Sequence, residues 1–141
     1  RPPAGGRAVT VRASGADVPG WIAFAGALAA GSAVALGAFG AHALADLVTP
    51  TRLATFETGV RYQFLHALAL LVLGRTGVPG APHAARRIAV TLVLGVVLFS
   101  FSLYALVATG LGAFGAVAPA GGVLMLAGWV QWAWCLRPRG G

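Results

Sequence analysis

The sequence is short of charged residues. They make up only 9% of its 141 residues, there is no lysine, and the acids are three: Asp17, Asp46 and Glu57. A water-soluble globular domain carries about 25% charged residues, so this chain lacks the polar surface of an ordinary soluble enzyme. Cys135 is its only cysteine, which excludes a disulfide-stapled scaffold. The few acids also exclude a disordered acidic tail.

Apolar residues take the place of the missing charge. They form 58% of the chain, and the mean hydropathy is +0.84. Two long stretches, residues 18–45 and 88–136, contain no Asp, Glu, Lys or Arg. A membrane-spanning helix needs about 20 apolar residues. The first stretch therefore predicts a span over residues 21–44. A cleaved signal peptide is the alternative for this segment, but its apolar region would cover only about 7–15 residues.

The second stretch is long enough for two spans, which we place at residues 88–108 and 116–136 on either side of a glycine-rich hairpin. Between the two stretches, Thr49 and Pro50 predict a helix start, because threonine is a good cap and proline is tolerated in the first turn. This helix would place a further span at residues 58–74, although several polar residues fall within it.

The positions of the arginines decide whether this polar segment crosses the membrane. With four spans, the N-terminal tail, the middle loop and the C-terminus share one side and hold eight of the ten arginines. With three spans, the same arginines divide three against five. Arginine and lysine accumulate in cytoplasmic loops, so the count favours four spans with both termini in the cytoplasm.

The sequence therefore predicts an all-α membrane protein with four transmembrane helices in a compact bundle. Residues 1–20 are expected to be a disordered basic tail, residues 21–136 the membrane domain, and residues 137–141 a second basic tail. The arginines flank apolar segments and do not gather on one soluble face, so nucleic acid is not an expected partner. Membrane lipids, a second copy of the chain or a larger membrane complex are the expected partners.

Ionisable groups inside a membrane helix are costly and need a reason. Glu57 and Arg61 are four residues apart and can pair on one helix face. Tyr62 and His66 have the same spacing on a face about 140° away, so the two pairs must meet different neighbours. Glu57 and Arg61 form either an interfacial ion pair or a buried functional pair. For His66 we expect an interhelical hydrogen bond. Gln63 belongs to the same group of candidate functional residues.

No pattern in the sequence indicates catalysis or metal binding. His42 closes the first span, but two histidines without an acid or thiol partner are a weak signal, since structural zinc usually has four ligands. Ser100 and Ser102 lie in an apolar span, where hydroxyls bond back to the helix or across to a neighbour. We therefore expect no catalytic residue, no metal and no cofactor, and no enzyme activity. An enzyme or haem protein would instead give a coloured or metal-containing preparation.

Small residues at helical spacing indicate close helix packing, because they let backbones approach. The candidate packing residues are all glycines in the first and last spans: Gly26, Gly37, Gly40, Gly121, Gly122 and Gly128.

Four segments, taken in order, resemble a known family. They are LGAFGAH at 36–42, YQFLHALAL at 62–70, LFSFSLY at 98–104, and PAGG at 119–122 followed by LAGW at 126–129. They are similar to the domain of unknown function 423 (DUF423) family, which is related to eukaryotic transmembrane protein 256. Where that family often has threonine before the proline of the last segment, this chain has Ala118.

The resemblance implies a four-span inner-membrane protein and brings no established activity, cofactor or catalytic residue. His42, Tyr62, Gln63 and His66 fall inside the matched segments. We expect an integral plasma-membrane protein with a non-enzymatic structural or accessory role. The alternative is a small oligomeric transporter or channel subunit that uses His66 or the Glu57 and Arg61 pair for proton or ion coupling.

Overall fold

A computed structural model describes residues 18–138, and over that range the chain is entirely helical. Two of its segments are single π-helical turns, η1 and η2. Each continues a neighbouring α-helix without a break, so that α3, η2 and α4 form one rod, which we call the third rod. The elements in order are α1 (Gly20–Phe39), η1 (Gly40–Leu44), α2 (Pro50–Thr76), α3 (Pro82–Val96), η2 (Val97–Phe101), α4 (Ser102–Thr109) and α5 (Gly112–Leu136). The predicted all-α fold is confirmed.

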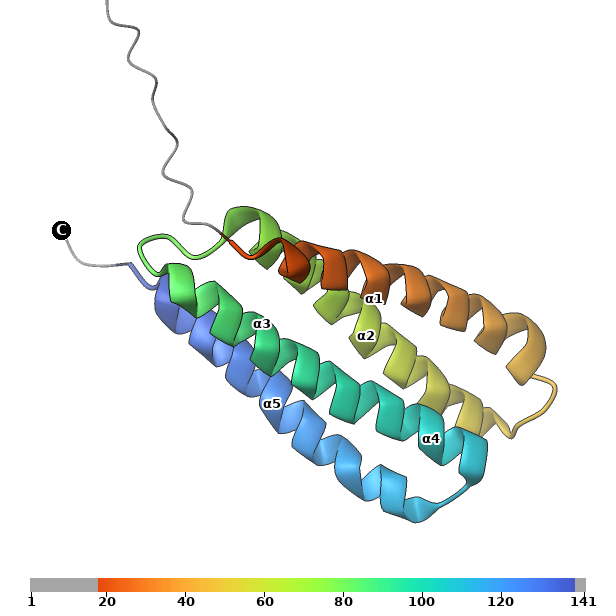
Figure 1. The fold of residues 1–141 in the computed structure, drawn as a ribbon. Helices are drawn as coiled ribbons and strands as arrows, with labels where there is room; N and C mark the ends of the chain where they lie inside the picture. The colour runs from red at the N-terminus through yellow and green to blue at the C-terminus, as the bar shows by residue number, and fades with distance from the viewer. Residues whose placement is uncertain (1–17, 139–141) are drawn as a thin grey trace, which may run out of the picture.

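The helices lie side by side as four long rods (Figure 1). The first rod, α1 with η1, packs against α2; α2 packs against the third rod; and the third rod packs against α5. Within the described chain, α1 and α5 lie on opposite sides and make no extended contact, so the bundle is an open layer and not a closed ring. The start of α1 and the end of α5 lie at the same end of the bundle.

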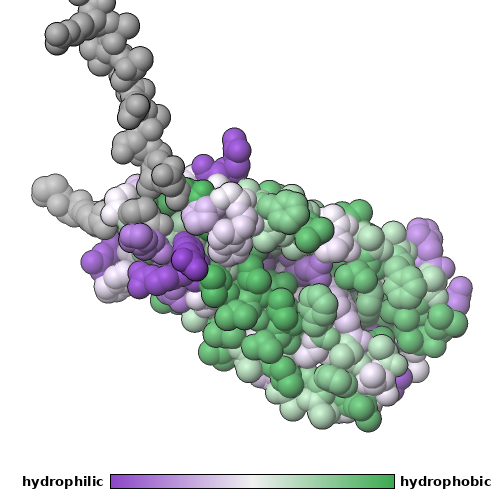
Figure 2. Space-filling view, in the orientation of Figure 1, coloured by the Kyte–Doolittle hydropathy of each residue, from purple (hydrophilic) through white to green (hydrophobic). Residues whose placement is uncertain are grey.

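On the face shown in Figure 2, apolar residues cover most of the middle of the bundle and hydrophilic residues lie at both ends. Within residues 18–138, 3 helices are apolar enough by length and composition to cross a membrane: Trp21–Leu44, His83–Thr109 and Gly112–Leu136. These are the first, third and fourth predicted spans. α2 is long enough but does not reach the same hydropathy.

Local sequence explains where α2 begins. The Thr49 side chain accepts a hydrogen bond from the backbone N–H of Arg52 at 3.4 Å, and Pro50 takes the first helical position. This start is where the sequence placed it. At the far end of the third rod, Gly110 adopts a positive φ of 74° and closes the predicted hairpin.

The loop between α2 and α3 is shorter than predicted. We expected the third span to start at residue 88, after a loop rich in proline and glycine, but α3 already begins at Pro82. Proline suits the first turn of a helix, where its missing N–H costs nothing. The first turns of α3 also supply buried core residues, Ala84 and Ala85, which stabilise a helix that sequence pattern alone did not indicate.

The predicted tails lie largely outside the described residues, which exclude 1–17 and 139–141. Two residues assigned to the tails are held by the bundle. Val18 packs against the hydrophobic core, and the Arg137 guanidinium lies 4.0 Å above the centre of the Trp134 ring. Apolar and cation–π contacts of the bundle thus continue to Val18 and Arg137.

The hydrophobic core lies in the half of the bundle that contains the start of α1 and the end of α5. Its largest fully buried members come from three of the rods: Ile22, Leu73, Ile88 and Leu92. In the other half, near η1 and the start of α2, the first rod and α2 diverge and a groove lies between them. Glu57 and Arg61 of α2 lie in this half.

Candidate functional site

Gln63 joins three helices through its side-chain amide. Its Nε2 donates to the Ala29 carbonyl at 3.0 Å and to the Ser32 hydroxyl at 2.8 Å, both on α1. Its Oε1 accepts from the Tyr104 hydroxyl on α4 at 3.0 Å. Gln63 is only 4% exposed, so a polar side chain that would be costly in an apolar interior is satisfied at both ends of its amide.

Ser100 connects the third rod to α2. Its hydroxyl donates to the Gly59 carbonyl at 2.8 Å, and the serine is fully buried. It lies in the π-helical turn η2, a geometry often found at functional sites. Ser102, two residues later, bonds back to the Phe99 carbonyl of its own rod at 2.8 Å. The two serines thus show the two behaviours expected for hydroxyls in an apolar span, one across to a neighbour and one back to the helix.

His66 bridges α2 and α5. The indole N–H of Trp129 donates to His66 Nε2 at 3.1 Å, and His66 Nδ1 lies 2.8 Å from the Tyr62 carbonyl oxygen. A carbonyl oxygen only accepts, so Nδ1 carries the ring hydrogen and the imidazole is neutral in this arrangement. The interhelical hydrogen bond expected for His66 is present, and its partner is the Trp129 indole.

Tyr62 extends the aromatic contacts around His66. Its ring stacks on the His66 ring at 6.1 Å between centres and contacts Phe99 of η2 at 4.9 Å. Together with Trp129 these side chains line an open groove of about 330 Å³ between α2 and α5. The groove is aromatic, and the two nitrogen atoms of His66 are already occupied by protein partners.

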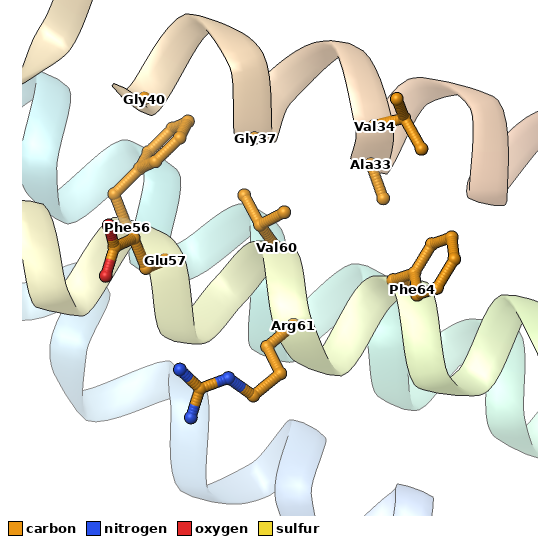
Figure 3. A pocket seen from close by; sticks show the side chains of 9 residues that line it. All are labelled: Ala33, Val34, Gly37, Gly40, Phe56, Glu57, Val60, Arg61 and Phe64. Carbon is orange, nitrogen blue, oxygen red and sulfur yellow. The ribbon is translucent and has the colours of Figure 1, made fainter. Parts of the chain in front are cut away.

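Glu57 and Arg61 face a different groove, as their helix position predicted. This groove of about 400 Å³ lies between α1 and α2 (Figure 3). Both side chains are exposed, and no ion pair joins them in the described chain. Neither of the two arrangements considered from their spacing, an interfacial ion pair or a buried pair, is therefore formed.

His42 lies apart from the other candidate residues. It is exposed in η1, whereas His66 is buried between α2 and α5. Within residues 18–138, no three His, Cys, Asp or Glu side chains come together in a way that could hold a metal ion.

Three of the candidate packing glycines lie at close helix crossings. A Cβ at Gly26 would stand 2.8 Å from the Leu71 backbone nitrogen, one at Gly128 would stand 2.5 Å from Leu92 Cδ2, and one at Gly121 would overlap the Phe99 backbone. These glycines allow backbone approach, as small residues do in membrane helices.

The other three candidates have more space. A Cβ at Gly37 would meet only Val60 Cγ1 at 3.7 Å, one at Gly122 only Phe99 Cδ2 at 4.0 Å, and one at Gly40 the Phe56 ring at 3.2 Å. Gly37 and Gly40 line the groove between α1 and α2.

Sequence reasoning missed several residues that the bundle uses. Gly59, Gly74 and Gly95 are as tightly enclosed as the glycines we chose, and Tyr104 and Trp129 donate two of the interhelical hydrogen bonds. A usable signal existed for the two aromatics, since each carries a polar group that needs a partner when it lies inside a membrane domain.

These features define a class: an all-helical, multi-pass membrane protein whose buried polar side chains join its helices to one another. The family described as "Protein of unknown function (DUF423)" matches residues 36–122. The chain belongs to this family, as the sequence segments indicated.

Two bacterial relatives illustrate the family. The UPF0382 membrane protein of Staphylococcus aureus (strain bovine RF122 / ET3-1) is 41% identical over 107 residues, which cover 75% of this chain and 86% of the relative. The UPF0382 inner membrane protein YgdD of Escherichia coli (strain K12) is 44% identical over 103 residues, or 68% of this chain and 73% of the relative.

No solved structure matches the chain. Together with the three apolar helices, the two relatives confirm the expected location in the plasma (inner) membrane.

Proposed function

We propose that the protein is a non-enzymatic structural or accessory protein that crosses the plasma membrane four times, with both termini in the cytoplasm. One observation carries the non-enzymatic role. Every buried polar side-chain atom in the described chain has a hydrogen-bond partner within the protein. Gln63, His66 and Ser100 join helices to one another, Ser102 bonds within its own rod, and none of these buried groups is left unpaired to activate a substrate.

The proposed topology has three supports. α2 has 27 residues and is about 40 Å long at 1.5 Å per residue, more than the roughly 30 Å of a bilayer core. It also lies between α1 and the third rod, both apolar enough to span a membrane, and its buried polar residues Gln63 and His66 bond to other helices. The arginine distribution favours the same four-span arrangement.

Cysteine labelling tests the topology. Cys135 is first replaced by alanine, and then Leu47→Cys or Pro79→Cys places one thiol in the exposed turn at either end of α2. We expect a membrane-impermeant maleimide added to intact cells to label Leu47→Cys, and to label Pro79→Cys only after permeabilisation. Labelling of both variants from the same side would show that α2 does not cross, and would overturn the four-span topology.

The second candidate function is a small oligomeric transporter or channel subunit. The observation in its favour is the exposed Glu57 and Arg61 on a helix that we place in the membrane. Charged residues within membrane segments are often part of ion or proton pathways.

A flux assay separates the two functions. Proteoliposomes that contain the full chain and a pH-sensitive dye are given a proton, potassium or chloride gradient. An accessory protein leaves the leak at the level of empty vesicles. A faster flux that is lost in His66→Ala or Glu57→Gln would contradict the accessory role and establish the transporter.

A further inference from the structure

The groove between α1 and α2 combines an apolar floor with two charged side chains. The side of the groove formed by the first rod, which we call its floor, carries small residues, among them Gly37 and Gly40, and these leave the groove wide (Figure 3). The opposite wall comes from α2, where Val60 and Phe64 add apolar surface. The groove has a volume of about 400 Å³ and lies where the first rod and α2 diverge.

Glu57 and Arg61 stand at the edge of this groove. Side chains on a helix lean toward its N-terminus. In Figure 3 the Arg61 side chain leaves α2 on the side away from α1, with its guanidinium displaced toward the start of the helix. At 1.5 Å per residue the two residues lie about 10 and 16 Å beyond Pro50. In the proposed topology this depth belongs to the outer leaflet, near its headgroups.

The two charges have no ion-pair partner in the described chain, either in each other or elsewhere. An exposed acid and base at this depth are costly unless something meets them. Their Cβ atoms are about 5–6 Å apart, as on any helix at this spacing. A ligand that satisfies both must carry a negative and a positive group a few bonds apart, followed by an apolar part for the floor.

We propose that the groove binds a zwitterionic aminophospholipid of the outer leaflet. The Arg61 guanidinium binds the phosphate, for which its planar, two-pronged donors are suited. The Glu57 carboxylate binds the ammonium group, which a two-carbon linker holds beside the phosphate. One acyl chain lies on the floor over Gly37. This inference rests on the proposed function, since it names a ligand for a non-enzymatic membrane protein of that topology.

Charge complementarity distinguishes this ligand from other lipids. Phosphatidylglycerol carries the phosphate but no amine, so it meets Arg61 and leaves Glu57 beside a negative headgroup. For a second copy of the chain to satisfy both charges, its Arg61 would have to meet Glu57 and its Glu57 would have to meet Arg61 in the same groove. Phosphatidylethanolamine supplies both charges and the apolar chain in one molecule.

Native mass spectrometry of the purified full chain tests the proposal. The protein is equilibrated with equal amounts of phosphatidylethanolamine and phosphatidylglycerol, and the retained lipid is measured. We expect the wild type to retain phosphatidylethanolamine about tenfold better, the effect of one charge-assisted hydrogen bond. Glu57→Gln removes this preference, Arg61→Gln weakens retention of both lipids, and Gly37→Leu fills the floor and weakens retention of both.

Arg52→Gln is the matched control. It removes an arginine from the same end of α2 but from outside the groove, and it should retain lipid as the wild type does. Equal retention of the two lipids by the wild type, or an unchanged preference in Glu57→Gln, overturns the proposal. So does a stable dimer that excludes lipid, since the groove then belongs to a second copy.

The two proposals fail in different experiments. A wrong lipid assignment leaves the cysteine labelling and the flux measurements unchanged. A wrong topology or a transport activity appears in those measurements alone. The thermal stability of each variant is compared with that of the wild type, so that a loss of retention is not mistaken for a loss of fold.

Discussion

Gly121 and Gly122 are neighbours on α5, yet only Gly121 faces the backbone of the third rod. A Cβ at Gly121 would overlap the backbone nitrogen of Phe99 and stand 2.8 Å from both Phe99 Cα and the Gly95 carbonyl oxygen. A Cβ at Gly122 would meet nothing nearer than Phe99 Cδ2 at 4.0 Å. The same substitution at adjacent positions therefore tests the crossing of α5 and the third rod.

We expect the two alanine variants to change stability in opposite directions. In a helix interior, alanine is better than glycine by about 1 kcal/mol. Gly122→Ala should gain most of this amount. At Gly121 the added methyl meets backbone atoms, which move only if the two rods separate, and overpacking of this kind costs about 1–3 kcal/mol. Because all three of the nearest atoms belong to backbone and lie closer than 3.0 Å, we expect the upper end of that range, so that Gly121→Ala loses about 2 kcal/mol net.

Unfolding in mixed detergent micelles measures the difference. Increasing the fraction of sodium dodecyl sulfate and following helix content gives the free energy of unfolding for each variant. The half-buried Cys135 beside the core provides a second probe, because a thiol-reactive dye labels it as the bundle opens. A Gly121→Ala variant as stable as the wild type, or a Gly122→Ala variant that loses as much, would refute the close crossing.

Three further predictions concern the interhelical hydrogen bonds, which in membrane proteins average about 0.6 kcal/mol each and reach about 1.7 kcal/mol. Ser100→Ala should cost about 0.6–1.7 kcal/mol in the same unfolding assay, whereas Ser102→Ala, which loses only a bond within its own rod, should cost far less; equal losses would contradict the assigned roles. Gln63→Leu removes three bonds and should cost about 2 kcal/mol, and an unchanged unfolding free energy would argue against the network. Trp129→Phe keeps the aromatic ring but removes the indole N–H, so a double-mutant cycle with His66→Ala should give a coupling of about 0.6 kcal/mol; additive losses would show that the two side chains do not interact.

Local signals predicted much of the fold. The Thr49 cap and Pro50 placed the start of α2, and the glycine-rich stretch placed the turn at Gly110, because each depends on a few neighbouring residues. The start of α3 was missed because it does not depend on neighbouring residues alone. Its first turn is stabilised by Ala84 and Ala85 packing into the core, and this tertiary contact leaves no periodic mark in so short a segment.

The candidate site was predicted less completely. Helix spacing separated the Glu57 and Arg61 face from the Tyr62 and His66 face, and the two pairs do line different grooves. Spacing cannot give the point at which two helices cross. Gly26 lies at the close approach of α1 to α2, whereas Gly37, three turns later on the same helix, lines the groove that opens where the two rods diverge.

The low hydropathy of α2 follows from its place in the bundle. An outer helix such as α1 or α5 must present apolar side chains to lipid along most of its length. α2 has the first rod on one side and the third rod on the other, and its hydrogen bonds reach every other rod: Gln63 to α1 and α4, Gly59 to η2, and His66 to α5. Polar residues that would make a lone helix a poor span are thus satisfied by its neighbours. Glu57 and Arg61 are the exception, since no neighbouring helix meets their charges, and for that reason we assign them to a ligand and not to the fold.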